Sequence, residues 1–422
     1  MMGMFGMVLF NLVDTFFISR LGTAPLAAMS FTFPVVMVLG SISLGLGIGV
    51  SAVISHAIGT GDNKGVQRLT TDSLFLSVAL VTLFVVLGLL TVDPLFRALG
   101  AKGETLTLIN HYMLIWYLGM PFVVIPMVGN SAIRAAGNTM IPSMIMLTAI
   151  GVNLVLDPLL IFGIGPFPRL ELRGAAIATV IARSITLLVS LYYLRYRFDM
   201  LTSHIPSISK LAVSWRKILY VGIPAALTQL TMPISMGVIT RLVAAYGVSA
   251  VAAFGIGTRV EMFALSPLMS LSAVLIPFTG QNLGAGKIDR VEGGIRFSHR
   301  FSLALGLAIF CIFLLFGKWI AQLFNPDPEV ISIVILYLVI VSIGYGFQGI
   351  VAVTASSFSA LNHPMHAIAL NSFRMIILYI PISMIASRYF GVAGIFSGAS
   401  ISAVIAGISS IFWVRSILKK LS

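Results

Sequence analysis

Charged residues are scarce in this chain of 422 residues. Asp, Glu, Lys and Arg together make up 9% of it, hydrophobic residues make up 58%, and the mean hydropathy is +1.05. A water-soluble domain carries about 25% charged residues, and a chain of this length could not bury so many apolar stretches against one another in water. The scarcity of charge therefore argues against a soluble protein and predicts an integral membrane protein.

Cysteine and the signatures of catalysis are also scarce. Cys311, the single cysteine, lies in an apolar run, so a disulfide framework within the chain is excluded. His363 and His366 have the spacing of metal ligands, but the sequence near them adds no further Cys or His, which favours an ordinary loop. The sequence shows no phosphate-binding P-loop and no serine–histidine or paired catalytic carboxylates. We therefore expect no cofactor, no step driven by ATP and no enzymatic activity.

Positive charge exceeds negative charge, with 26 Lys and Arg against 13 Asp and Glu. A surface that binds nucleic acid needs its basic residues on one face, whereas here they stand in short gaps between apolar runs. With the amino terminus inside, alternate gaps place fifteen basic residues on the inner side and eight on the outer side. Because cytoplasmic loops retain Lys and Arg, the sequence predicts a multi-pass protein of the inner (cytoplasmic) membrane with both termini in the cytoplasm. Its expected partner is the lipid bilayer and not nucleic acid.

Twelve apolar runs are long enough to cross a bilayer as helices. They cover residues 1–19, 27–57, 73–92, 107–133, 140–163, 174–196, 216–244, 250–280, 297–320, 329–358, 365–388 and 392–416. Several contain proline, so we expect bent helices. The first run barely spans a bilayer, and we therefore expect the natural start to lie upstream of Met1.

The two halves of the chain resemble each other at a constant shift of 225 residues. LGTAPLAA at 21–28 aligns with YGVSAVAA at 246–253, and GTG at 59–61 aligns with GAG at 284–286. Since six spans separate the halves, an even number, the repeats share one orientation and an axis along the membrane normal should relate them, with a cavity between. We therefore expect an all-α membrane protein, a monomer, with twelve transmembrane helices in two pseudo-symmetric six-helix lobes. The lobes are residues 1–196 and 216–422, joined by a cytoplasmic linker at 197–215.

Acidic residues inside spans form the first candidate site, because a carboxylate in hydrocarbon costs several kcal/mol unless it is neutralised, paired or hydrated. Asp14 and Asp157 lie about five and about six residues from the outer ends of their spans, so they share a similar depth. Asn153 precedes Asp157 by one helical turn, and Thr179 lies at a comparable depth in the sixth span. These side chains could bind a sodium ion through oxygen, or the two acids could share a proton. The alternative is that the acids bond to helix ends and that Thr179 bonds to its own backbone.

Glu261 lies deeper, in the eighth span, two residues after Arg259. Residues two apart on a helix do not face each other, so the pair should have separate partners. Glu261 is either a second protonatable site or a structural partner of Arg374 or Arg183. The substrate cavity candidates combine polar groups with adaptable thioethers, and they are Asn11, Gln229, Met232 and Met236.

Four ordered motifs stand out along the chain. They are NLVDT at 11–15 followed by RLG and PLAA at 20–22 and 25–28, IRAAGN at 133–138, NLVLDP at 153–158 and GQNLGAG at 280–286. Together they resemble the motifs of the multidrug and toxic compound extrusion (MATE) family. The resemblance covers nearly the whole chain and is closest to the prokaryotic branch that is similar to DNA-damage-inducible protein F.

The resemblance implies a two-lobed bundle that opens alternately to either side of the membrane. It implies export of cationic or amphipathic compounds against inward flow of sodium or protons, with a cation site at Asp14, Asn153, Asp157 and Thr179. The norfloxacin-exporting branch has acids in the seventh and tenth helices that this chain lacks, so a cation site of that kind is not expected in the second lobe. Phe10 stands where some members have a tyrosine one turn before the first acid, which removes one hydrogen bond of the site.

The sequence thus predicts a secondary active multidrug efflux transporter. One alternative is a lipid-linked saccharide flippase of the same superfamily, which would need a strongly basic central cavity. Arg183, Arg259 and Arg374 are the basic residues within spans that could form one. The other alternative is a membrane receptor or enzyme that transports nothing. It would be recognised by ligand binding without movement of the ligand across the membrane.

Overall fold

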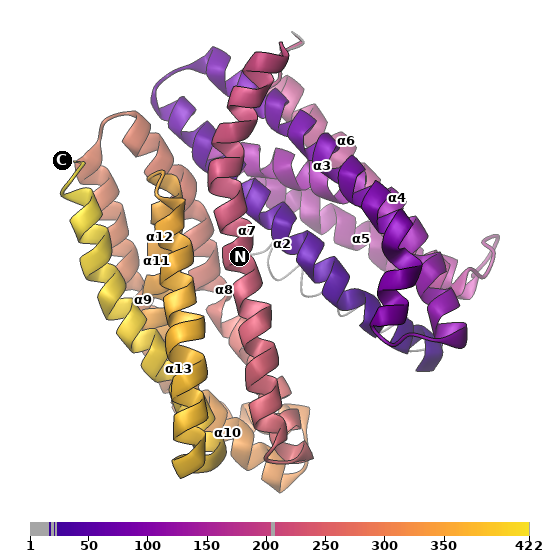
Figure 1. Cartoon of the computed structure of the whole chain (residues 1–422), viewed down its shortest axis with the longest axis vertical. Helices are drawn as coiled ribbons and strands as arrows, with labels where there is room; N and C mark the ends of the chain where they lie inside the picture. The colour runs from indigo at the N-terminus through magenta and orange to yellow at the C-terminus, as the bar shows by residue number, and fades with distance from the viewer. Residues whose placement is uncertain (1–16, 18–20, 22, 204–206, 422) are drawn as a thin grey trace. The chain divides into compact units, whose positions relative to one another are not determined.

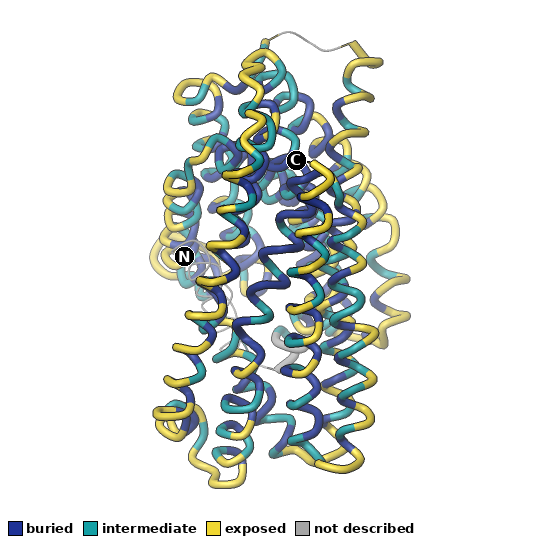
Figure 2. Tube along the Cα trace, turned by 90° about the vertical axis from the view of Figure 1, so that its left-hand side faces the viewer, coloured by how far each residue is buried: buried dark blue, intermediate teal, exposed yellow. Residues whose placement is uncertain are grey.

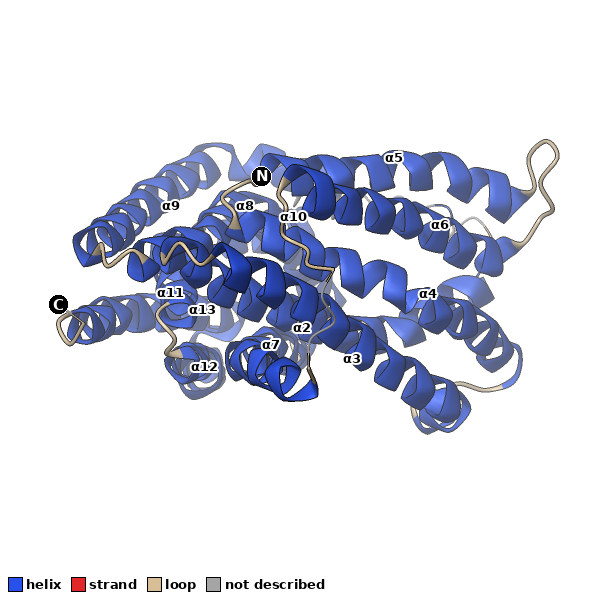
Figure 3. Ribbon diagram, turned by 90° about the horizontal axis from the view of Figure 1, so that it is seen from above, coloured by secondary structure: helices blue, strands red, loops and turns tan. Residues whose placement is uncertain are grey.

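The computed structural model describes Phe17, Leu21, residues 23–203 and residues 207–421. Every regular element in this part of the chain is a helix, and Figure 3 shows the helices joined by short loops. Lipid offers no hydrogen bonds to a backbone, so an apolar run that spans a membrane has to satisfy its N–H and C=O groups within the segment. The expectation of an all-α membrane protein is confirmed.

Two compact units divide the chain. The first contains residues up to Ile58 and Asp62–Gly222, and the second contains the turn Gly59–Gly61 and Ile223–Ser422. The boundary therefore falls inside a helix, α7 (Ile208–Ala244), and not in a loop.

Helices of the first unit are drawn from indigo to magenta in Figure 1. Within it α4 packs against both α3 and α6, and α5 packs against α6. Two apolar cores hold these helices together, one around Ile109 and Met113 and the other around Ile54 and Ile133. The helices are α2 (Thr23–Gly59), α3 (Asn63–Ala98), α4 (Gly103–Ala135), α5 (Met140–Phe162), α6 (Glu171–Tyr192) and the π-helix η1 (Tyr193–Arg197).

In the second unit α11 is the central helix, because it packs against α8, α9 and α13. Its apolar cores lie around Tyr345 and Phe396 and around Phe358. The helices that follow α7 are α8 (Val248–Gly284), α9 (Ile288–Phe324), α10 (Pro328–Ser342), α11 (Tyr345–Ala360), α12 (Pro364–Ser372), the π-helix η2 (Phe373–Tyr379) and α13 (Ile380–Leu418).

The tenth expected span, 329–358, is broken in the middle. Helices α10 and α11 meet at Ile343–Gly344 with a bend of 51°. A Cβ atom on Gly344 would lie 2.9 Å from the Cα atom of Ser400, so only glycine allows this close approach. The expected continuous helix is corrected to a broken one.

The run Pro364–Leu418 contains two spans and not one. Gly391 interrupts it with φ 58° and ψ −137°, a conformation that glycine alone adopts without strain. The Ser383 hydroxyl donates to the carbonyl oxygen of Ile395 at 3.1 Å, so the two halves of the run fold back on each other. Together with the other long helices and the broken pair, the described residues account for eleven of the twelve expected spans. The first, 1–19, lies outside the described residues except for Phe17.

Apolar side chains remain exposed along the helices, as a lipid environment requires. Leu90, Leu188 and Leu315 are 72%, 68% and 74% exposed, whereas many Ser and Thr side chains are buried. Figure 2 shows buried residues along one side of most helices and exposed residues along the other. Exposed apolar side chains and buried small polar ones fit helices that face lipid and pack against one another through Ser and Thr.

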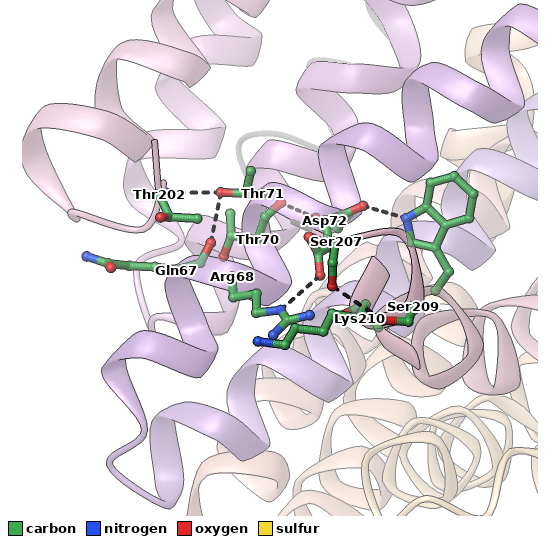
Figure 4. A network of polar contacts seen from close by, with 12 residues as sticks. Gln67, Arg68, Thr70, Thr71, Asp72, Thr202, Ser207, Ser209 and Lys210 are labelled. Carbon is green, nitrogen blue, oxygen red and sulfur yellow. Dashed lines mark hydrogen bonds and ion pairs between the residues drawn. The ribbon is translucent and has the colours of Figure 1, made fainter. Parts of the chain in front are cut away.

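The residues that directly follow η1, 198–203, are hydrogen-bonded to α3 (Figure 4). Gln67 donates to the Asp199 carboxylate at 3.0 Å, and the hydroxyl of Thr71 accepts from the backbone N–H of Thr202 at 3.0 Å. The indole of Trp215, near the start of α7, donates to the Asp72 carbonyl oxygen at 2.9 Å. Residues 198–203 and the start of α7 thus pack within the first unit.

Candidate functional site

A buried asparagine and a buried aspartate lie one turn apart on α5. Asn153 is 1% exposed and Asp157 is fully buried, and the Asn153 amide donates to Oδ2 of Asp157 at 2.5 Å. The i, i+4 spacing on a regular helix brings them together, as the sequence predicted. Helix α5 packs along α6, so the pair is held within the first unit and away from lipid.

The amide oxygen of Asn153 is available to bind a further group. Oδ1 of Asn153 is buried and accepts no hydrogen bond from the described part of the chain. A buried amide oxygen without a donor is costly, so the position favours a cation or a further donor at that oxygen. Carboxylate and amide oxygens are the ligands that hard cations prefer.

Pro158 follows directly after Asp157 inside α5. Proline has no N–H, so the carbonyl of Leu154 loses its partner in the helix, and the proline ring weakens the helix at this turn. The buried acid therefore stands where α5 can change its bend most easily.

Of the other two members of the expected cation site, Thr179 is the one that lies among the described residues. Thr179 is half-buried on α6 and forms no hydrogen bond with Asn153 or Asp157 in the described part of the chain. Asp14 and Asn11 lie outside the described residues. The ring of Phe17 contacts that of Phe162, at the end of α5, with centroids 6.2 Å apart. The four-residue cation site stays a prediction.

Glu261 is the centre of a polar cluster in the second unit. The Tyr337 hydroxyl, from α10, donates to Oε2 of Glu261, and the Gln348 side chain, from α11, also bonds to the carboxylate. Arg374, on η2, carries the opposite charge and interacts with Glu261 electrostatically. Whether Glu261 is a protonatable site or a structural partner stays a prediction. Arg259 is exposed and does not join the cluster. The sequence analysis did not identify Tyr337 and Gln348 as partners of Glu261. The signal that could have indicated them is that each is a polar side chain within an apolar span.

The remaining candidates have simpler surroundings. Gln229 and Met236 are half-buried on α7, whereas Met232 is 55% exposed. The rings of His363 and His366 stack with centroids 5.3 Å apart, and the described residues contain no group of three possible metal ligands around them. These histidines therefore pack as aromatic rings.

Comparison with known proteins gives consistent matches over the whole chain. The MatE family model matches residues 1–159 and 224–385. The "FAD transporter" of Shewanella oneidensis is 40% identical over 408 residues, which is 97% of this chain and 90% of the relative. "Multidrug export protein MepA" of Staphylococcus haemolyticus is 27% identical over 431 residues, covering 100% of this chain and 92% of the relative.

A solved structure has the same fold. The crystal structure of the Vibrio cholerae MATE transporter VcmN in the bent form is similar with a TM-score of 0.93 and 33% identity, covering 100% of this chain and 94% of that one. The long family match, the 40% identity and the shared fold lead to one assignment. The chain belongs to the MATE family of membrane transporters.

Proposed function

We propose that this protein is a secondary active exporter that exchanges amphipathic organic compounds for protons or sodium ions by alternating access. The observation that carries the proposal is the Asn153–Asp157 pair, which buries an acid inside an apolar helix and leaves the Asn153 amide oxygen open to a ligand. An acidic side chain inside a membrane-spanning helix is costly to bury, so ion coupling is the first role to test for it.

The coupling step follows from charge. A proton or a sodium ion bound at Asp157 neutralises the carboxylate, and this changes the electrostatic field at a turn of α5 that Pro158 weakens. An ion shifts a conformational equilibrium only if it binds the two states with different affinity. We propose that the change at Asp157 supplies this difference and favours the state that releases substrate outward.

The substrate class has two candidates. The family and the relative named a multidrug export protein favour cationic or amphipathic compounds. The relative named an FAD transporter is more similar, with 40% identity over 97% of this chain, and it favours a dinucleotide with a flat ring system and an anionic pyrophosphate. Export of flavin dinucleotide is therefore the second proposed activity.

The test is efflux from proteoliposomes with a sodium gradient and a proton gradient imposed separately. Asp157→Asn removes the charge that the ion neutralises, and Asp93→Asn is a matched control because Asp93 lies at an exposed end of α3, paired with Arg97. We expect efflux under one gradient, lost in Asp157→Asn and kept in Asp93→Asn. Equal efflux by both variants would contradict ion coupling at Asp157. Lipid translocation without efflux of either substrate class would favour the flippase.

A further inference from the structure

Two hollows lie along the seam between α4 and α6 in the first unit, where these helices pack along each other (Figure 1). Each hollow has a volume of about 300 Å³. One is polar, lies near the beginning of both helices, and is lined by Leu108, His111 and residues 169–173. The other is apolar, lies deeper along the same seam, and is lined by α4 between Ile115 and Phe122 and by α6 between Ile177 and Ile181.

The polar hollow has an excess of positive charge. Nη2 of Arg169 and Oε1 of Glu171 lie 3.2 Å apart, so these two charges offset each other. Arg173 also lines the hollow, and in the described part of the chain no acid forms an ion pair with it. The imidazole of His111 donates a hydrogen bond in either protonation state. One surplus positive charge beside a further donor suits a phosphate group with one negative charge.

The apolar hollow is a groove with a closed floor and open sides. A Cβ atom on Gly119 would lie 2.2 Å from Cγ2 of Val180, so α4 and α6 meet here over a residue that has no side chain. Leu118 and Ile181, at the sides, are 56% and 41% exposed. Contacts inside a membrane depend on van der Waals packing, and a groove with apolar walls packs well against a hydrocarbon chain.

The two hollows follow each other in the order of the parts of a phospholipid. On α4 His111 precedes Ile115 by one turn, and on α6 Arg173 precedes Ile177 by one turn. From His111 to Phe122 the seam runs about 16 Å, at about 1.5 Å per residue. This length is close to half of a hydrocarbon core that is about 30 Å thick. The charge distribution predicts that the polar hollow lies at the outer face, so the seam has the length and polarity of one lipid in the outer leaflet.

We propose that the seam between α4 and α6 binds an anionic phospholipid of the outer leaflet. Arg173 and His111 bind its phosphate, and one acyl chain lies in the groove over Gly119. A free phosphate ion would occupy the polar hollow and leave the groove unused, so the alignment of the two hollows favours a lipid. The site lies apart from the Asn153–Asp157 pair, and the inference does not depend on the proposed export function.

The test is titration of the full-length protein in detergent, with bound lipid counted by native mass spectrometry. The probes are phosphatidylglycerol, phosphatidylcholine with the same acyl chains, and glycerol 3-phosphate, which has the phosphate without the chains. We expect wild type to bind one phosphatidylglycerol more tightly than phosphatidylcholine. Arg173→Gln should raise the Kd for phosphatidylglycerol about fivefold, the effect of one basic residue near an anionic lipid. Arg388→Gln, an exposed arginine on α13, is the matched control and should bind as wild type does.

Two further variants separate recognition from folding. Glu171→Gln removes the one acid among the residues that line the polar hollow and releases Arg169, so it should lower the Kd for phosphatidylglycerol about fivefold, a gain that damage to the fold would not produce. Ile181→Trp fills the groove at an exposed position, so it should weaken binding of both lipids without changing thermal unfolding of the lipid-free protein.

Four results would overturn the inference. The first is equal binding of phosphatidylglycerol by wild type and Arg173→Gln, and the second is equal binding of the two lipids by wild type, which would mean lipid without a specific site. The third is glycerol 3-phosphate bound as tightly as phosphatidylglycerol, the mark of a site for free anions. The fourth is weaker binding of phosphatidylglycerol by Glu171→Gln.

Discussion

At the scale of single residues, Asn153 is an unusual choice for a helix in a membrane. It is buried, it donates one hydrogen bond to Asp157, and its amide oxygen accepts none from the described residues. A leucine of similar size would pack without a desolvation cost. Asn153 therefore suits a role in binding a cation through its amide oxygen better than a role in helix packing.

Asn153→Leu tests this reading. We expect efflux driven by the ion gradient to fall by about tenfold or more, because the variant loses both the bond to Asp157 and the open oxygen. Thermal stability in detergent should change by no more than about 1 kcal/mol, since a single hydrogen bond inside a membrane protein is worth roughly 0.6 kcal/mol on average. Asn371→Leu is the control, because Asn371 bonds only to its own helix. Normal ion-driven efflux by Asn153→Leu would exclude it from the site.

At the scale of helices, most of the fold could be predicted from the sequence and two features could not. Apolar runs predict the helices because a backbone in lipid has to satisfy its hydrogen bonds within the segment. The i, i+4 spacing of a helix correctly placed Asn153 beside Asp157. The break at Gly344 was missed because the hydropathy continues across it, and its cause is the contact with Ser400, far away in sequence. The partners of Glu261 were missed for the same reason: Tyr337 and Gln348 come from other helices.

Glycine at a helix crossing gives one prediction at this scale. A Cβ atom on Gly49 of α2 would lie 2.5 Å from the carbonyl oxygen of Ile218 on α7, so Gly49→Ala should lower the stability of the protein by about 1–3 kcal/mol. On the same helix a Cβ atom on Gly40 would meet nothing within 4 Å. Gly40→Ala should therefore leave thermal unfolding in detergent unchanged or raise its midpoint. Equal midpoints for the two variants would contradict this crossing.

The turn at Gly391 gives a prediction that depends on conformation alone. A Cβ atom there would touch only a Tyr246 ring atom at 3.7 Å, but φ is positive. Gly391→Ala should therefore cost about 1–3 kcal/mol of stability from backbone strain. Gly151→Ala, at an open helical position on α5, is the comparison, and both are measured by thermal unfolding. A neutral Gly391→Ala would show that the turn relaxes to another conformation.

At the scale of the whole molecule, the distribution of Lys and Arg predicts the orientation in the membrane. In a Cys311→Ser background, Pro166→Cys lies in an exposed loop between α5 and α6, and Ser207→Cys lies in the exposed segment before α7. We expect a membrane-impermeant maleimide to label Pro166→Cys in intact cells and Ser207→Cys only after permeabilisation. The opposite pattern would place both termini outside.

Hydrogen bonds with Gln67, Thr71 and the Asp72 carbonyl oxygen of α3 hold residues 198–203 and the start of α7 within the first unit. The chain passes from one unit to the next at Gly222–Ile223, inside α7, with Pro224 beside the boundary. A helix resists twisting and stretching but yields at a glycine and a proline. The covalent connection between the units is thus a continuous helix whose one weak point is Gly222–Pro224, so a single substitution there would change its stiffness.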